Sequence, residues 1–299
     1  MRLLDRVVAL TLPAVPKPVA RIFARPYIAG ETIHDQMAVV KLLNDQGFMV
    51  ATSILGEFVT RREESEEAVR DYEKVLATVQ ERRLDSNIHV KLTHLGLKLD
   101  KEFCYRNVRR LVRFAGERSN FVRIDMEDSS CTDDTLEIYA RLREQFDNVG
   151  CVLQARLRRS LADARELAKA RANVRVCKGI YLEPYDIAYP DPELIRSNFT
   201  LLVEELLGAG CYVGIATHDE RLLWDACRAV ERLGLDPSRY EFQMLHGVET
   251  TLRRIVREAG HRLRVAVPFG PSWYAYSLRR FRENPQIAGH VFRALFKPS

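Results

Sequence analysis

Eight short apolar runs, rich in β-branched residues, recur along the chain between turn and cap residues. They cover residues 48–55, 87–93, 121–127, 149–155, 174–180, 212–218, 240–245 and 264–270. Runs of this length and composition are typical of strands that are buried on both faces. Charged segments with helical spacing lie between them, over residues 65–83, 133–146, 160–172 and 220–234. Several of these segments open on a Ser or Asp cap. The pattern predicts strands that alternate with helices.

The spacing of the runs predicts the fold class. Successive runs begin about 31 residues apart on average, which is the size of one βα unit. Eight units without a break in composition predict an α/β fold of the (βα)8 TIM-barrel type. A doubly wound sheet is the main alternative, but no GxGxxG follows any run and no linker interrupts the middle of the chain. We expect one domain over residues 1–299, with a helical lead-in over 1–45 and the barrel and a C-terminal helix over 46–299.

Composition narrows the class further. A chain of 299 residues with 46% hydrophobic and 29% charged side chains can bury a large core, which excludes a disordered, collagen-like or small disulfide-bonded protein. The net charge of +5 is spread along the chain and gives nucleic-acid binding no special support. The six cysteines form no CxxC pair, so we expect reduced thiols in a reducing compartment.

The first 30 residues are basic and nearly free of acids. A targeting peptide is one interpretation; a basic amphipathic helix that packs on the domain is favoured, because serine is absent there. The same segment could instead bind a membrane surface. No apolar stretch reaches the roughly 18 residues of a membrane-spanning helix, so we expect a cytoplasmic protein, with peripheral contact at the inner face of the cytoplasmic membrane left open.

Polar side chains follow almost every apolar run. In (βα)8 barrels the functional site lies at the carboxyl ends of the strands, so this crowding predicts a site at the barrel mouth. The residues in question are Glu57, Lys91, Asp125, Glu127, Gln154, Arg156, Lys178, Thr217, His218, Gln243 and His246.

Lys91 and Lys178 stand inside otherwise apolar runs, and a buried ammonium needs an anion beside it. Asp125, Glu127 or a bound ligand could supply that charge. One chemistry that follows is a Schiff-base aldolase with either lysine as nucleophile. A metal site built from Asp125, Glu127 and nearby histidines (His218, His246) is less favoured, because no HxH or HExxH spacing supports it.

A charged helix is predicted after the last strand, over residues 273–284. Tyr276, Arg279, Arg280 and Glu283 recur there at i, i+3, i+4 and i+7 and therefore share one face. Two guanidinium groups beside an aromatic ring suit capture of a small carboxylate. The alternative is a solvated face with an intrahelical ion pair. A solvated face is the usual interpretation of a charge run, but the turn over residues 268–270 leads straight from the strand end into this helix and would place the face over the barrel mouth if the helix folds inward.

The motifs, taken in order, resemble those of the monofunctional bacterial proline dehydrogenases. The resemblance extends from about Tyr27 to Pro285 and is carried by VKLTHLGL, IDMEDS, VLQA, VRVCKGIY, GIATHDE, EFQMLHGV and VPFG followed by WYAYSLRR. It implies a (βα)8 flavoenzyme that oxidises L-proline to Δ1-pyrroline-5-carboxylate by hydride transfer to flavin N5. FAD would be the cofactor, and a membrane quinone would accept the electrons. No metal and no catalytic base are implied.

The resemblance also assigns roles to positions of this sequence. Arg279 and Arg280 would hold the substrate carboxylate with Lys91, and Asp125 would hold Arg280. The side chains implied to pack the pyrrolidine ring are Tyr181, Leu245 and Tyr276. The positions implied to contact FAD are Gln154, Arg175, Cys177, Lys178, Gly179, Thr217, His218 and Glu283.

The chain departs from the family pattern around the substrate. The family usually has a tyrosine where this sequence has Ala266, and a small residue where it has Ile180; Arg156 and Leu182 replace aromatic residues. Ala266 should open space that Ile180 partly fills, so a substituted proline such as hydroxyproline is an alternative substrate. A barrel that binds ligand without turnover is a third interpretation.

Overall fold

The computed structural model describes residue 21 and residues 24–274, and its strands form a closed barrel. Neighbouring strands are parallel and follow chain order around the barrel, and β8 pairs with β1 to close it. The strands are β1 Met49–Ile54, β2 Ser86–Val90, β3 Val122–Ile124, β4 Val149–Gln154, β5 Asn173–Cys177, β6 Tyr212–Ala216, β7 Tyr240–Leu245 and β8 Leu263–Phe269. The predicted (βα)8 fold class is confirmed.

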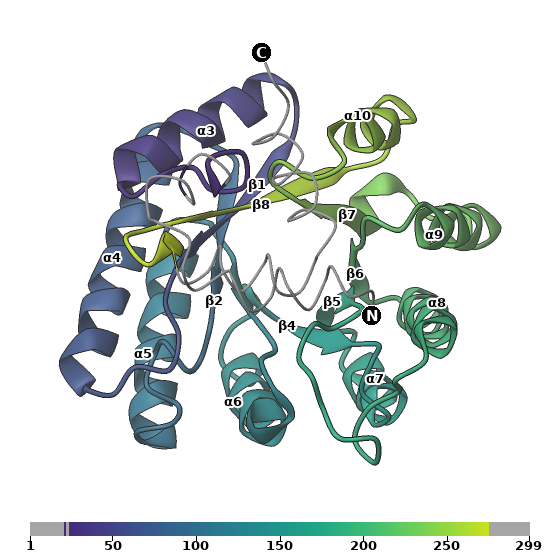
Figure 1. The fold of residues 1–299 in the computed structure, drawn as a ribbon, viewed down its shortest axis with the longest axis horizontal. Helices are drawn as coiled ribbons and strands as arrows, with labels where there is room; N and C mark the ends of the chain where they lie inside the picture. Colours follow the sequence, from purple (N-terminus) through teal and green to yellow (C-terminus); the bar gives the residue numbers. More distant parts are fainter. Residues whose placement is uncertain (1–20, 22–23, 275–299) are drawn as a thin grey trace, which may run out of the picture.

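Helices surround the strands in a ring (Figure 1). They are α3 Ile33–Asp45, α4 Arg62–Glu81, α5 Lys101–Gly116, α6 Thr132–Arg143, α7 Ser160–Lys169, α8 Pro192–Gly208, α9 Glu220–Arg232 and α10 Thr250–Glu258, with short 3-10 helices η2 Ser129–Cys131 and η3 Pro237–Arg239. The helices predicted over residues 65–83, 133–146, 160–172 and 220–234 match α4, α6, α7 and α9. No helix in the described ranges is both long and apolar enough to cross a membrane.

Local sequence signals begin several of these helices. Asp219 is the N-cap of α9 and accepts from the backbone N–H of Arg221, and Thr32 forms a capping box with Asp35 before α3. α7 is different, because its N-cap is Arg159 and the hydroxyl of Ser160 donates to the carbonyl of Gln154 instead.

The main apolar core lies between the strands and the ring of helices. Outward-facing strand residues such as Val50, Ile88, Val174 and Ile215 are fully buried there. The cysteines are all free thiols, as the sequence predicts, and four of the six are buried.

Polar side chains fill the barrel interior. Arg123 on β3 donates to the side chain of Asn173 on β5, and Arg175 on β5 reaches His89 on β2. These strands are not neighbours in the closed barrel, so the contacts must cross its interior. Lower in the barrel, Glu241 accepts hydrogen bonds from Arg264 at 2.8 and 3.0 Å. The barrel therefore holds charges below its mouth, and each needs a partner.

Candidate functional site

The fold brings most of the sequence-predicted residues together at the carboxyl ends of the strands. Asp125 and Lys91 directly follow β3 and β2, and Thr217 and His218 directly follow β6. The other described positions are Gln154, Cys177 and Leu245 at the last residue of their strands, Lys178 to Tyr181 after β5, Arg175 within β5 and Ala266 within β8.

Tyr276, Arg279, Arg280 and Glu283 lie outside the described residues. Their shared helical face, their carboxylate-binding role and the helix over the mouth remain predictions. So does the basic segment at the start of the chain.

The two lysines do not lie inside strands, which corrects the sequence interpretation. Strands β2 and β5 end one residue earlier, so both lysines stand at the rim, where their side chains are 22% and 37% exposed. Their partners also differ from the prediction: Lys91 donates to Glu57 at 2.9 Å and Lys178 to Asp219 at 2.5 Å. Because each ammonium pairs with a rim carboxylate, neither needs Asp125 or Glu127 as its counter-ion.

Asp125 instead pairs with Arg175. The Asp125 Oδ1 atom lies 3.0 Å from Nη2 of Arg175, and both side chains are largely buried. On the other side of the guanidinium, Nη1 of Arg175 lies 3.0 Å from Nδ1 of His89. The guanidinium thus bridges a carboxylate at the mouth and an imidazole below it.

Asp219 is shared by two cations. It accepts from Lys178 and, at 2.7 Å, from Nε of Arg196 on α8. Burial by itself raises the pKa of Asp219, but the hydrogen bonds and charges of the two cations together outweigh burial and lower the pKa to about 2. The carboxylate therefore stays ionised at the rim and holds Lys178 in place.

Gln154, the last residue of β4, lies close to Gly179 in the loop after β5. The Gln154 amide donates to the carbonyls of Met126 and Glu127, while its Oε1 atom is buried and accepts no hydrogen bond from any described residue. Gly179 has φ +90°, and a Cβ atom there would lie 2.6 Å from that oxygen. The positive φ and this close approach are why glycine is needed, and the unsatisfied oxygen can accept a hydrogen bond from a bound group.

The loop between β5 and α8 is fastened to the β4 and β3 ends. Arg156 donates to the Tyr181 carbonyl at 2.6 Å, and Arg158 donates to the Tyr185 carbonyl at 2.8 Å. Glu183 accepts from the backbone N–H of Ser129 at 2.7 Å. These contacts hold Tyr181 beside the mouth, while Leu182 in the same loop is 96% exposed.

Side chains on the far side of the mouth position one another. His218 accepts a hydrogen bond at Nε2 from the backbone N–H of Leu245, and Thr217 accepts one from the N–H of Asp219. Leu245 pairs in register with Ala266 on β8. Ile180, on the opposite loop, is 41% exposed.

Three further strand-end candidates, Gln243, Glu127 and His246, are not part of the rim pairs described above. Gln243 lies inside β7 and donates to Glu241 in the barrel interior. Glu127 accepts from Thr93 at 3.0 Å, and burial raises its pKa although those hydrogen bonds oppose the shift. Burial lowers the pKa of His246 to about 4, helped by the charge of Arg253.

The metal alternative finds no support. In the ranges that the structure describes, no three histidine, cysteine, aspartate or glutamate side chains gather in a way that could hold a metal ion.

Sequence reasoning missed three residues that pair with the site: Asp219 and Arg196 at the rim, and His89 below the mouth. His89 stands two residues before Lys91, and the two-residue period of a strand places both on the inner side of β2. That period was the available signal for His89. Arg196 had none, because nothing in the sequence tells which helix residue reaches another strand's end.

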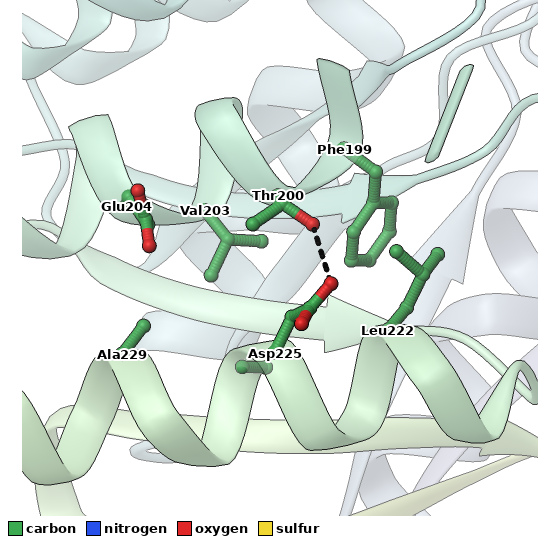
Figure 2. Close-up of a pocket in the computed structure, with 8 residues that line it drawn as sticks. Phe199, Thr200, Val203, Glu204, Leu222, Asp225 and Ala229 are labelled. Carbon is green, nitrogen blue, oxygen red and sulfur yellow. Dashed lines mark hydrogen bonds between the residues drawn. The ribbon is translucent and has the colours of Figure 1, made fainter. Parts of the chain in front are cut away.

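A separate cleft lies on the outer ring between α8 and α9 (Figure 2). Thr200 and Asp225 face each other across it with 3.4 Å between their oxygens, and the lining side chains leave no room for a water molecule. The cleft is the packing seam of two helices of the outer ring, its lining includes none of the strand-end residues, and it is not the candidate site.

Comparison with known proteins defines the class of this barrel. The sequence profile described as proline dehydrogenase matches residues 37–293. The chain therefore belongs to the proline dehydrogenase family, as the motifs predicted.

Individual relatives agree over nearly the whole chain. Proline dehydrogenase of Deinococcus radiodurans is 36% identical over 279 residues, which cover 92% of this chain and 90% of that protein. Proline dehydrogenase 1 of Bacillus subtilis (strain 168) is 33% identical over 277 residues, covering 93% and 92%. Such full-length matches support the monofunctional type.

Solved structures share the fold. Proline utilization A from Bdellovibrio bacteriovorus, inactivated by N-propargylglycine, has a TM-score of 0.82 at 23% identity, covering 88% of this chain and 33% of that one. Proline utilization A from Corynebacterium freiburgense has a TM-score of 0.78 at 20% identity, covering 97% and 34%. This chain thus corresponds to about a third of those longer proteins.

Proposed function

We propose that this chain oxidises L-proline to Δ1-pyrroline-5-carboxylate with FAD, and that a membrane quinone then accepts the electrons. The family membership and the full-length relatives named proline dehydrogenase support the substrate and the reaction. We also propose that residues 1–299 act as one domain in the cytoplasm, with peripheral contact at the membrane where the quinone resides.

The observation that most favours this proposal is the ion pair of Asp125 and Arg175. By the family resemblance Asp125 belongs to the substrate side and Arg175 to the flavin side, and 3.0 Å separates their charged atoms. The two proposed subsites therefore adjoin at the barrel mouth. Such adjacency is what transfer of a hydride between two bound molecules requires.

The residues at the mouth fit a flavin. The buried Gln154 Oε1 atom, which accepts no hydrogen bond from any described residue, suits a bound ring that carries a hydrogen-bond donor. Arg175 and Lys178 supply positive charge beside it, which favours a cofactor that gains negative charge. When bound, FAD would supply the two-electron acceptor that no protein side chain can provide. We propose Gln154, Arg175, Cys177, Lys178, Gly179, Thr217, His218 and Glu283 as its contacts.

The protein's own part is to bind, orient and exclude water. We propose that Lys91 binds the proline carboxylate together with Arg279 and Arg280, and that Tyr181, Leu245 and Tyr276 pack the ring. Asp125 orients the neighbouring guanidinium groups. None of these groups has to act as a nucleophile or a base, since positioning lowers the barrier to hydride transfer.

The decisive experiment is a visible spectrum of the purified protein, reconstituted with FAD where needed, followed by anaerobic L-proline. We expect flavin absorbance that bleaches with L-proline and does not change with cyclopentanecarboxylate, which has no amine to oxidise. Flavin that bleaches only with hydroxyproline would change the substrate. Binding without bleaching would favour the barrel without turnover.

The aldolase alternative is tested in parallel by borohydride treatment with a carbonyl substrate. We expect no added mass on Lys91 or Lys178, because each ammonium donates to a carboxylate. A lysine adduct together with an absence of FAD binding would reverse the proposal.

A further inference from the structure

His89 lies in β2 below the mouth. The proposed function gives roles to its neighbours Arg175 and Asp125 but none to His89. Its side chain is 3% exposed, against 15% for Arg175 and 19% for Asp125. The three groups therefore descend from the mouth into the barrel, with the imidazole deepest.

The hydrogen-bond pattern fixes the tautomer of His89. A guanidinium can only donate, so the Nδ1 atom of His89 accepts from Nη1 of Arg175 and the ring proton lies on Nε2. Burial lowers the pKa of His89 well below its usual range, and the charges of Arg175, Arg123 and Arg264 lower it further. The ring is consequently a neutral acceptor for Arg175.

This arrangement is unfavourable for folding alone. The Nε2 atom is buried and has no hydrogen-bond partner in the part of the chain that the structure describes. A buried donor without an acceptor destabilises the folded state. What histidine supplies is the hydrogen-bond acceptor for one arm of the Arg175 fork, while the other arm forms the ion pair with Asp125.

We propose that His89 is a positioning residue for the oxidation: its Nδ1 fixes Nη1 of Arg175, so that Nη2 keeps Asp125 oriented where substrate and flavin meet. This inference rests on the proposed function. It assigns His89 no contact with substrate or cofactor, and its effect passes through the guanidinium to the carboxylate. Among the described residues the Nη1 atom of Arg175 bonds only His89, so loss of the imidazole acceptor frees that arm of the fork.

The test compares His89→Leu, which removes the acceptor, with His89→Gln, whose amide oxygen can replace it. His261→Leu is the matched control, since that ring lies before β8 at the amino end of the barrel and bonds the Tyr240 hydroxyl at 2.8 Å. The readouts on the FAD-loaded protein are kcat/KM for L-proline, the dissociation constant of cyclopentanecarboxylate, and the unfolding midpoint.

We expect His89→Leu to lower kcat/KM roughly 10- to 100-fold and to weaken binding of the analogue, and His89→Gln to recover part of both. His261→Leu should lower the unfolding midpoint but leave kcat/KM within about twofold, because its ring is remote from the reacting groups. Unchanged kinetics and analogue affinity in His89→Leu would overturn the inference. The inference would also be overturned if both His89 variants lost activity and analogue affinity only in proportion to a smaller fraction of folded protein.

The inference and the proposed function fail in different ways. Wild-type protein whose flavin does not respond to L-proline would reject the function. Wild-type protein that responds, alongside a His89→Leu variant with the same affinity for the analogue, would reject only the role of His89.

Discussion

The carboxylate of Asp219 lies 2.5 Å from the ammonium of Lys178, and this pair joins the rim of β5 to the start of α9. Asp219 is also the N-cap of that helix, where its other oxygen accepts from the N–H of Arg221. One side chain thus begins a helix and holds a residue that we propose to contact flavin. Local stability and the site depend on the same carboxylate.

Asp219→Asn should destabilise the fold by about 2 kcal/mol at pH 7, as expected for a carboxyl whose pKa falls from 3.8 to about 2 on folding. Because the folded pKa is the lower one, this contribution is present above about pH 4 and is lost as the pH falls through about 2. Urea unfolding at pH 7 and at pH 3 should therefore show a smaller difference from wild type at pH 3. The control is Asp225→Asn on the same helix, whose carboxylate is paired only weakly with Thr200 at 3.4 Å; an equal loss there would contradict the assignment.

Arg156 should control the position of Tyr181. Its guanidinium bonds the Tyr181 carbonyl at 2.6 Å, so Arg156→Gln should release this part of the loop and raise KM for L-proline about tenfold, with a smaller effect on kcat. Arg158→Gln is the matched control, because it frees the same loop four residues further on, at Tyr185. Steady-state kinetics on both variants would decide; equal KM values in the two would show that the loop's attachment, and not Tyr181, matters.

Much of the fold was predictable because buried parallel strands carry a continuous apolar signal. All eight predicted runs contain the observed strands or overlap them, and the closed order follows from their number and spacing. The ends were less accurate: β2 stops at Val90, where the predicted run continued through Lys91 to Thr93. Apolar residues after a strand also fill turns, as Leu92 and Leu95 do here, so composition alone overextends the strand.

The sequence predicted which residues lie at the site, but not which cation pairs with which carboxylate. Strand-end position was enough to place Lys91, Asp125 and Lys178 at one mouth. Which carboxylate each cation meets depends on loops and helices far away in the sequence: Glu57 comes from the β1–α4 loop and Asp219 from the start of α9. Sequence adjacency carries no information on such contacts.

Replacing only one partner of the buried Glu241–Arg264 ion pair should reduce the free energy of unfolding more than replacing both. Glu241→Leu removes the nearest carboxylate from the buried Arg264 guanidinium and should cost about 3–5 kcal/mol, whereas the double variant Glu241→Leu with Arg264→Met should cost less than the single change. Urea unfolding of the two single variants and the double variant measures this coupling. Simple addition of the single effects would show that the pair contributes nothing beyond each side chain's own packing.

Ala266 should set the preference between proline and substituted prolines. It pairs in register with Leu245, which we propose to pack the substrate ring, and a methyl group there leaves space that the family's tyrosine would fill. Ala266→Tyr should therefore shift the ratio of kcat/KM for L-proline over 4-hydroxyproline toward proline by about tenfold or more, the range expected for closing a pocket around one added group. Ile180→Ala is the complementary change. It shortens a side chain in the loop after β5, where Ile180 is 41% exposed, and should shift the ratio toward hydroxyproline because it opens space there. Steady-state kinetics with both substrates on the two variants measure the shifts. If wild type already preferred proline by a large margin and Ala266→Tyr left the ratio unchanged, Ala266 would have no part in choosing the substrate.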